Sequence, residues 1–350
     1  KAMHFAVIKT IKIGAELVFN LVLFLYLPGF LAKHPDSFIL KFLPVKADFT
    51  YMLFSILMSC IICTMLMLPY FMKIKFRISP KMVKPMLVYA IPLLIAGIPG
   101  VANDFIDRLL FQFCTPDSMS WQTSLGLFQA NVKLAVLMTL FVQMFRYAAE
   151  PFFFSHSTEK DSKHLYALVM KYFVIFCMFI FLLIALNLDY IGYILGKSFR
   201  EGLGVVPIML MANMLLGISF NLSFWFKLSG QTQMAVWITL SGLFVTLVVN
   251  LIFMPIYGYY AAAWGHLLSY LCMVVVSYLL SLKYYPIQYE WWRIVQMILV
   301  GIALFFITHW VRFEARILQL LFNNVLIIIY LAYVIYKEKL WRLIPRKLWK

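Results

Sequence analysis

Ten long apolar stretches joined by short loops make up almost the whole chain, and they decide what it can fold into. They cover residues 3–29, 50–72, 84–113, 124–154, 165–188, 203–228, 234–254, 260–282, 291–311 and 316–336. Each is close to the ~20 residues that a helix needs to cross a bilayer. A membrane barrel strand would instead show about ten residues of strict alternation. The sequence therefore predicts an all-α integral membrane protein, a polytopic bundle of about ten transmembrane helices.

Composition and charge support this prediction and orient the chain. Hydrophobic residues make up 64% of the chain and charged residues only 13%, too few to build a water-exposed surface at this length. Lys and Arg gather on alternate loops, with 18 on the side of the loop at 73–83 and 7 on the other. The positive-inside rule places the first side, with the C-terminus, in the cytoplasm. The basic tail from 337 to 350 is typical of an anchor on anionic membrane lipid, and the scattered charge argues against nucleic acid as a partner.

Motifs of catalysis and metal binding are missing from the sequence. The six histidines are scattered and none belongs to an HExxH motif, and no DxD motif or nucleophile elbow occurs. Cys60 and Cys63 form a CxxC inside an apolar run, where we interpret them as small buried hydrophobic residues. The loops leave no room for a soluble catalytic domain. We therefore expect no enzyme, no metal site and no cofactor.

Ionisable residues at membrane depth are the candidates for function. Each costs about 2.5 to 3.5 kcal/mol on insertion scales unless it is paired or hydrated. Two interpretations remain open, a hydrated substrate pathway lined by these groups or ion pairs that only hold the helices together. The first stretch carries two of them, the third carries three and the fourth carries three, in this order: Lys12, Glu16, Asp104, Asp107, Arg108, Lys133, Arg146 and Glu150.

Depth estimates suggest which of these groups meet. At 1.5 Å per residue, Asp104 and Lys133 each lie about 14 Å from the outer ends of two successive antiparallel stretches. We therefore predict that Lys133 lies near Asp104 or Asp107. Arg146 and Glu150 are closer to the cytoplasmic edge, where a pair on the helix surface is as consistent with the sequence as a functional role.

Prolines and glycines single out the third stretch further. Pro85, Pro92 and Pro99 recur every seven residues, and Gly97 and Gly100 stand beside the last of them. Each proline removes a backbone hydrogen bond and permits a kink. Pro92, Pro99, Gly97 and Gly100 are therefore hinge candidates for a helix that bends during a transport cycle, although prolines are common in membrane helices generally.

The same region carries a resemblance to a known family. The runs PLLIAGIPGVANDFIDRLLF, LGLFQANVKLAVLMTLFVQMFRYAAEPFFFSH, GKSFREGLGVVPIMLMANMLLGISFNLSFWFKLSGQTQ and LVVNLIFMPIYGYYAAAWGHLLSYL follow one another in the chain. This ordered series resembles the polysaccharide biosynthesis flippases of the multidrug/oligosaccharidyl-lipid/polysaccharide exporter superfamily, in the form found in Bacteroidetes-type proteins. One departure stands after the proline at 255, where Ala261, Ala262 and Ala263 replace a Gly-x-x-Gly-Ala-Ala pattern, which puts close helix packing there in doubt.

The resemblance implies a MATE-like fold of two six-helix lobes, with this chain matching helices five to fourteen and the first four absent. Residues 1–80 would then be the remainder of the first lobe, 81–285 the second lobe, and 286–350 two additional helices with the basic tail. It implies a flippase of the bacterial inner membrane that moves polyprenyl-pyrophosphate-linked oligosaccharide by alternating access, for O-antigen, capsule or exopolysaccharide. Lys133 and Arg108 would serve its anionic substrate, with H⁺ or Na⁺ as a possible coupling ion. A multidrug/cation antiporter using Asp104, Asp107 and Glu16, or a membrane enzyme of glycan assembly, remain alternatives.

Overall fold

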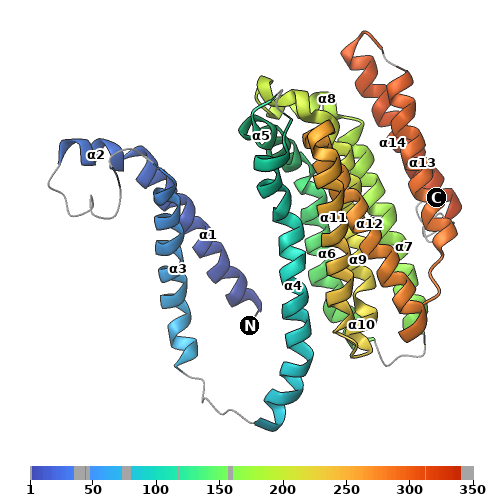
Figure 1. Ribbon diagram of the computed structural model, residues 1–350, viewed down its shortest axis with the longest axis horizontal. Helices are drawn as coiled ribbons and strands as arrows, with labels where there is room; N and C mark the ends of the chain where they lie inside the picture. The colour runs from blue at the N-terminus through green and yellow to red at the C-terminus, as the bar shows by residue number, and fades with distance from the viewer. Residues whose placement is uncertain are drawn as a thin grey trace, which may run out of the picture. The chain divides into compact units, whose positions relative to one another are not determined.

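The computed structural model describes residues 2–34, 44, 48–72, 80–116, 119–156, 161–311 and 313–339. Within these residues all regular elements are helical (Figure 1). Nine helices are long and apolar enough to cross a membrane, or ten if the bent pair α1 (Ala2–Leu25) and α2 (Leu27–Lys33) counts as one span. The predicted all-helical, multi-pass membrane protein is therefore confirmed. The basic loop at 73–79 and the tail at 340–350 lie outside the described residues.

The chain divides into two compact units, residues 1–83 and 84–350. In the first, α1 and α2 meet at Tyr26 with a bend of 40°, and α1 packs beside α3 (Phe49–Phe71). The predicted stretch 3–29 is thus a broken helix that continues to Lys33, and Pro28 in the first turn of α2 accounts for the break because it offers no N–H to the preceding turn. Tyr51 of α3 is fully buried against Phe24.

The second unit begins within α4 (Pro80–Cys114), which runs without interruption through its three prolines. The next span covers residues 121–155 and consists of α5 (Trp121–Val132), a 3₁₀ turn η2 (Lys133–Ala135) and α6 (Val136–Ser155). Ser120 caps α5, since its Oγ accepts a hydrogen bond from the N–H of Thr123 at 3.3 Å. After α7 (Ser162–Ala185) come the short α8 (Leu188–Ile191) and the 3₁₀ helices η3 (Gly192–Ile194) and η4 (Lys197–Gly204).

The remaining helices complete the bundle. They are α9 (Val205–Leu222), α10 (Phe224–Leu228), α11 (Met234–Tyr257), α12 (Tyr259–Tyr284), α13 (Trp291–Trp310) and α14 (Arg316–Lys337). The described residues contain no β-strand. The span that includes α9 is longer than predicted, because η4 precedes α9 and α10 follows it after Ser223. Their boundaries otherwise agree with the stretches read from the sequence to within a few residues.

The tightest packing in the second unit lies between α11 and α12. Gly258 alone joins the two helices, with φ +56°, a backbone conformation that glycine adopts without strain. Ala261, Ala262 and Ala263 follow it and are all at most 2% exposed. The doubt raised by the missing second glycine is therefore resolved, because three small residues in sequence allow the same close approach of helices.

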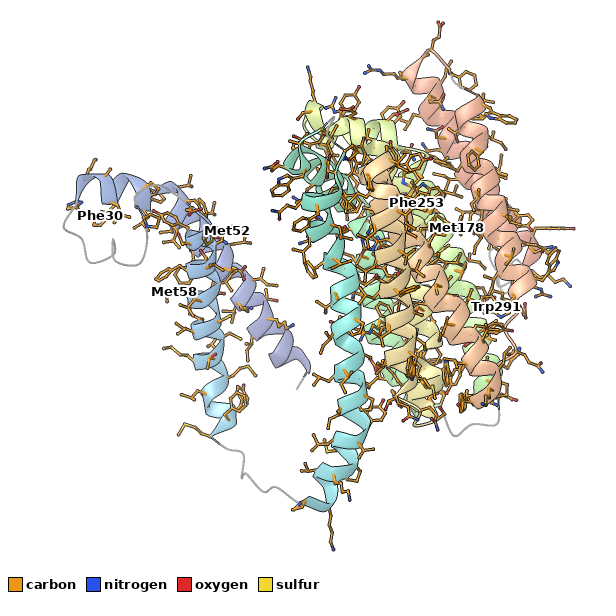
Figure 2. All side chains as sticks on the ribbon, viewed as in Figure 1. Phe30, Met52, Met58, Met178, Phe253 and Trp291 are labelled. Carbon is orange, nitrogen blue, oxygen red and sulfur yellow. The ribbon has the colours of Figure 1, made fainter. Side chains whose placement is uncertain are left out.

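A large apolar surface remains exposed on the helices, as a membrane protein requires. Figure 2 shows side chains projecting from the helices on all sides, among them Phe253 of α11, which is 43% exposed. Met178 of α7, labelled in the same figure, is fully buried in the core of the second unit. Lipid tails would cover the exposed set, since apolar residues facing hydrocarbon carry no penalty.

One buried ion cluster fastens α14 to α7. The Nζ of Lys171 lies 2.7 Å from Glu338 Oε2 and 3.3 Å from Glu290 Oε2, and the side chains of Lys171 and Glu338 are each only 4% exposed. Arg293 also pairs with Glu290, at 3.0 Å. From the sequence, Lys171 counted only as a charge at the cytoplasmic edge. Its burial shows that it holds the ends of α13 and α14 against the rest of the unit.

Candidate functional site

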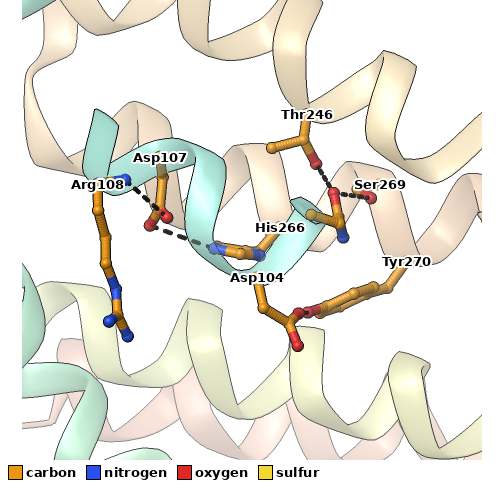
Figure 3. A network of polar contacts seen from close by, with 8 residues as sticks. Asp104, Asp107, Arg108, Thr246, His266, Ser269 and Tyr270 are labelled. Carbon is orange, nitrogen blue, oxygen red and sulfur yellow. Dashed lines mark hydrogen bonds and ion pairs between the residues drawn. The ribbon is translucent and has the colours of Figure 1, made fainter. Parts of the chain in front are cut away.

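Three polar residues of α4 point toward α12 and carry a network of contacts (Figure 3). Asn103 and Asp107 are four residues apart and share one helix face, and Asp104 stands beside them. Their partners on α12 run in the opposite order: Ser269 meets Asn103 and His266 meets Asp107. The two helices are therefore antiparallel where these residues meet.

Asn103 is the centre of the deeper part of the network. Its Oδ1 accepts hydrogen bonds from the hydroxyl of Thr246 on α11 and from that of Ser269, the latter at 3.2 Å. Ser269 also lies 2.9 Å from the carbonyl oxygen of Gly242. Asn103 is 2% exposed and both hydroxyl residues are fully buried. These bonds satisfy polar groups that would otherwise be unpaired inside the membrane.

Two carboxylates of α4 find separate partners on α12. Asp107 is 1% exposed, and its Oδ2 lies 3.4 Å from Nε2 of His266. Asp104 Oδ1 accepts a hydrogen bond of 2.8 Å from the hydroxyl of Tyr270. The other ring nitrogen of His266, Nδ1, is buried without a hydrogen-bond partner among the described residues. Asp107 and His266 therefore form a buried acid–base pair, whereas Asp104 keeps an exposed side.

Asp104 opens onto a cavity of about 410 Å³ inside the second unit. Six helices line it, namely α4, α6, α9, α10, α11 and α12. The lining of the cavity contains apolar side chains together with hydroxyl and amide groups. The polar and charged lining residues are Asn103, Asp104, Thr139, Gln143, Arg146, Ser219, Ser223, Lys227, Thr239, Tyr270 and Ser277.

The cavity contains two cations, and they differ in their partners. Lys227 of α10 donates to Glu150 Oε1 of α6 at 2.7 Å, and its side chain is 12% exposed. Arg146 lies one helical turn before Glu150, but it makes no ion pair among the described residues, and its guanidinium lies 4.7 Å from the centre of the Phe220 ring. Of the two alternatives that the sequence leaves open, the surface pair of Arg146 with Glu150 is therefore not formed among the described residues, where Glu150 pairs with Lys227. Arg146 remains available to an anion.

Two of the four hinge candidates also line this cavity. Gly97 and Gly100 line it, and a Cβ added at either would meet no atom within 4 Å. These glycines therefore make room in the cavity and do not serve close helix packing. Bending at Pro92 and Pro99 stays a prediction, as α4 is continuous through both.

The other predicted residues lie elsewhere. Lys133 begins the 3₁₀ turn η2, is exposed and forms no ion pair with Asp104 or Asp107 within the described chain, and its nearness to either carboxylate stays a prediction. Depth along a helix leaves the direction of a side chain open. Arg108 is exposed and lies 4.4 Å over the Phe105 ring. Lys12 and Glu16 are half-buried on α1 in the first unit.

Sequence reasoning missed several residues of the site. Lys227 counted only as a charge of a cytoplasmic loop, although it follows the aromatic run SFWF directly. His266 counted as one of six scattered histidines, and Asn103 was overlooked beside two aspartates. The usable signal was that a membrane helix carries polar residues at four-residue spacing, as α4 does at 103 and 107. Within the described residues no group of three or more His, Cys, Asp or Glu is placed to hold a metal ion.

Comparison with solved structures finds a likeness in fold. No family model matches the sequence, and no curated protein sequence matches it. A solved structure of the lipid II flippase MurJ, in an inward closed conformation, superposes with a TM-score of 0.54 over 93% of this chain, at 13% sequence identity. The chain spans 66% of the length of that solved chain. At this identity the likeness shows the fold alone, that of a polytopic helical bundle.

Proposed function

We propose that this protein is a flippase of the multidrug/oligosaccharidyl-lipid/polysaccharide exporter superfamily, and that it moves a polyprenyl-pyrophosphate-linked oligosaccharide across the bacterial cytoplasmic membrane. The observation that carries the proposal is a cavity among membrane-crossing helices that contains Arg146 and Lys227 together with neutral hydroxyl and amide groups. The fold likeness to a lipid II flippase supports a lipid-linked substrate of this type. Surface polysaccharide, such as O-antigen, capsule or exopolysaccharide, would be the destination of the glycan.

The chemistry of such a substrate matches the cavity lining. Its pyrophosphate is anionic and its sugars are hydroxyl-rich, so both are too polar to cross hydrocarbon unaided. A guanidinium without a carboxylate partner, as in Arg146, offers a phosphate two parallel N–H donors. The hydroxyls of Thr139, Ser219 and Thr239 and the amide of Gln143 can exchange hydrogen bonds with sugar hydroxyls.

Lys227 supplies the second cation, which is paired with Glu150. Its charge is balanced by Glu150 at 2.7 Å, and this pairing lowers the cost of keeping the Lys227 ammonium buried. A pyrophosphate that enters the cavity would compete with Glu150 for the same ammonium group. We assign Arg146 the first contact with the substrate anion and Lys227 a contact that forms as the substrate settles.

Alternating access would supply the movement. In this proposal residues 1–80 belong to one lobe, 81–285 form the other, and 286–350 are the additional pair of helices with a cytoplasmic C-terminus. The cavity glycines Gly97 and Gly100, with Pro92 and Pro99, would let α4 change curvature between the two access states. The orientation rests on the surplus of basic residues on one side of the membrane.

The buried pair of Asp107 and His266 is the candidate for ion coupling. The Asp107 Oδ2 and the His266 Nε2, 3.4 Å apart, can hold one proton between them, and release of that proton would leave a carboxylate beside a neutral imidazole. This pair is next to the cavity, because Asn103 and Asp104, which belong to the same part of α4 as Asp107, line the cavity. We propose H⁺ as the coupling ion, with Na⁺ as the alternative that carboxylate and amide oxygens would also accept.

A cation antiporter of the same superfamily is the second candidate, and Asp104 favours it. This carboxylate faces the cavity and could attract an organic cation. The two cavity cations argue the other way, because Arg146 has no described carboxylate partner to neutralise it. An enzyme of glycan assembly receives no support from the fold likeness to a transporter.

Complementation tests the proposal. In cells whose own polysaccharide flippase is deleted, the protein should restore surface glycan, and Arg146→Ala should reduce it at least about tenfold with membrane levels unchanged. Lys283→Ala is the matched control, since Lys283 is an exposed cation at the end of α12, away from the cavity. Restored drug resistance without restored glycan would favour the antiporter. Failure of the unaltered protein to restore any glycan would contradict the flippase.

A further inference from the structure

Two arginines from distant parts of the chain lie over one tyrosine ring. Tyr193 belongs to η3, and the guanidinium carbon of Arg200 in η4 lies 4.4 Å from the centre of its ring. The guanidinium carbon of Arg316, the first residue of α14, lies 5.9 Å from the same centre. The two cations are therefore no more than about 10 Å apart, which follows from these two distances.

This arrangement sits at the end of the membrane spans. The α7 span ends at Ala185 and α9 begins at Val205, with η3 and η4 between them, and α13 ends at Trp310 just before α14 begins. It is the end opposite the Lys171 cluster, since Lys171 lies near the start of α7 and Glu338 just after α14. Tyr193 is 53% exposed and its neighbour Ile194 is 79% exposed. Such a mixture of apolar, aromatic and cationic groups is typical of the headgroup level of a bilayer.

The hydrogen-bonding capacity of both guanidiniums is largely unused. Arg200 donates its Nε–H to the carbonyl oxygen of Leu195 at 3.3 Å, which leaves its terminal nitrogens free of described partners. Neither Arg200 nor Arg316 has a carboxylate within 4.0 Å among the described residues. Tyr190 also donates from its hydroxyl to the backbone carbonyl of Arg316 and so ties the two segments together. Stacking on a ring leaves the edges of a guanidinium open to a planar acceptor.

Two like charges brought to one ring favour an anion that both can reach. A phosphate accepts several N–H donors at once and is the anion that paired guanidiniums bind best. Two acidic residues belong to the same short helices. Glu201 of η4 follows Arg200 but forms no ion pair with it among the described residues, and Asp189 of α8 lines a pocket of about 580 Å³. The charge of Asp189 disfavours an anion inside that pocket. The pocket wall includes Leu188, Ile208 and Phe305, which suit the less polar part of a lipid.

We propose that Arg200 and Arg316, held on Tyr193, bind the phosphate of a membrane phospholipid headgroup and that this lipid bridges the η3–η4 segment and α14. The location at the span ends favours lipid over free phosphate, because phospholipid phosphates are concentrated at that level of the bilayer. The site lies outside the cavity assigned to transport, and its assignment does not depend on the transported substrate.

Native mass spectrometry of the detergent-purified protein with added phosphatidylglycerol tests the site. The unaltered protein should retain bound lipid, and the double variant Arg200→Ala/Arg316→Ala should bind it about tenfold more weakly. Lys197→Ala is the matched control, because Lys197 is an exposed cation of the same η4 segment that contacts no described ring or acid, and it should leave binding unchanged. Arg200→Lys/Arg316→Lys should recover part of the affinity, since charge remains but the planar donors are lost.

Three results would overturn the proposal. Equal lipid binding by the double variant and the unaltered protein would show that the arginines do not bind phosphate. Displacement of the lipid by millimolar inorganic phosphate would identify a free-anion site. A loss as large in Lys197→Ala would show unspecific attraction to charge. If the double variant fails to fold, Tyr193→Ala replaces it, because removing the ring should weaken binding about threefold or more while both charges stay.

Discussion

Lys227 of α10, which lines the cavity in the second unit, donates a 2.7 Å hydrogen bond to Glu150 of α6. The lysine is the less exposed partner, at 12% against 38% for the glutamate. The pair therefore links the short helix α10 to the long span that contains α6, and it holds the ammonium group of Lys227 at the cavity. Its two roles, in stability and in substrate binding, can be separated by substitution.

Removing only one member of this pair should destabilise the protein. Lys227→Met leaves the Glu150 carboxylate half-buried without its partner, and we expect a loss of about 1 to 2 kcal/mol in the free energy of unfolding, reduced because Glu150 is partly solvated. Lys227→Met/Glu150→Gln should recover most of this loss. Thermal unfolding in detergent measures both. A melting temperature of Lys227→Met equal to that of the unaltered protein would show that the ion pair contributes nothing.

Arg146 should matter more for transport than the cations that the sequence alone favoured. Arg146→Ala removes a guanidinium that lines the cavity, whereas Arg108 and Lys133 are exposed and absent from its lining. In the complementation assay we expect at least about a tenfold loss for Arg146→Ala and less than about threefold for Arg108→Ala or Lys133→Ala. The opposite ranking would mean that the substrate passes along the exposed face of α4 and α5.

Two glycines should respond in opposite ways to alanine. A Cβ at Gly100 meets no atom within 4 Å, so Gly100→Ala should leave stability unchanged or raise it by up to about 1 kcal/mol through helix propensity. A Cβ at Gly217 would come within 2.4 Å of the buried ring of Phe173, and Gly217→Ala should cost about 1 to 3 kcal/mol. Denaturation of both variants decides this. Gly100→Phe should in addition block transport by filling the cavity, with normal protein levels.

Asn103 should be the polar residue whose loss weakens α4 most. Asn103→Ala leaves the buried hydroxyls of Thr246 and Ser269 without their shared acceptor, and we expect a cost of about 1 to 3 kcal/mol. Asn324→Ala is the control, since Asn324 is exposed on α14 and bonds only to its own helix. If the two substitutions lower the melting temperature equally, the network around Asn103 is not holding α4 in place.

The two glutamates that pair with Lys171 should contribute unequally to the free energy of unfolding. Glu338 is 4% exposed and Glu290 is 40% exposed, although both lie within 3.3 Å of the same ammonium group. Glu338→Gln breaks the buried contact and should cost about 3 kcal/mol or more, whereas Glu290→Gln should cost about 1 kcal/mol or less. Limited proteolysis at the end of α14 should then reveal release of that helix in Glu338→Gln alone. Equal effects would contradict the burial seen here.

The helical spans could be predicted from the sequence, whereas the contacts of the charged residues could not. A run of about twenty apolar residues has one stable form in a membrane, which is why the spans agree with the structure. Charges are different, because depth along a helix leaves the rotation about its axis open. Lys133 and Asp104 have matching depths, yet Asp104 meets Tyr270 and Lys133 is exposed. The pairing of Lys227 with Glu150 joins residues 77 positions apart, which local patterns do not reveal.

Transport of a lipid-linked oligosaccharide in proteoliposomes tests whether the protein is a flippase. Vesicles containing the protein and a fluorescent polyprenyl-pyrophosphate-linked oligosaccharide would be quenched from outside, and the accessible fraction followed over time. For the full-length protein we predict flipping well above empty vesicles, at least about tenfold slower flipping with Arg146→Ala, and no transport of an organic cation. Flipping that is unchanged in Arg146→Ala, or transport of the cation in place of the glycolipid, would contradict it.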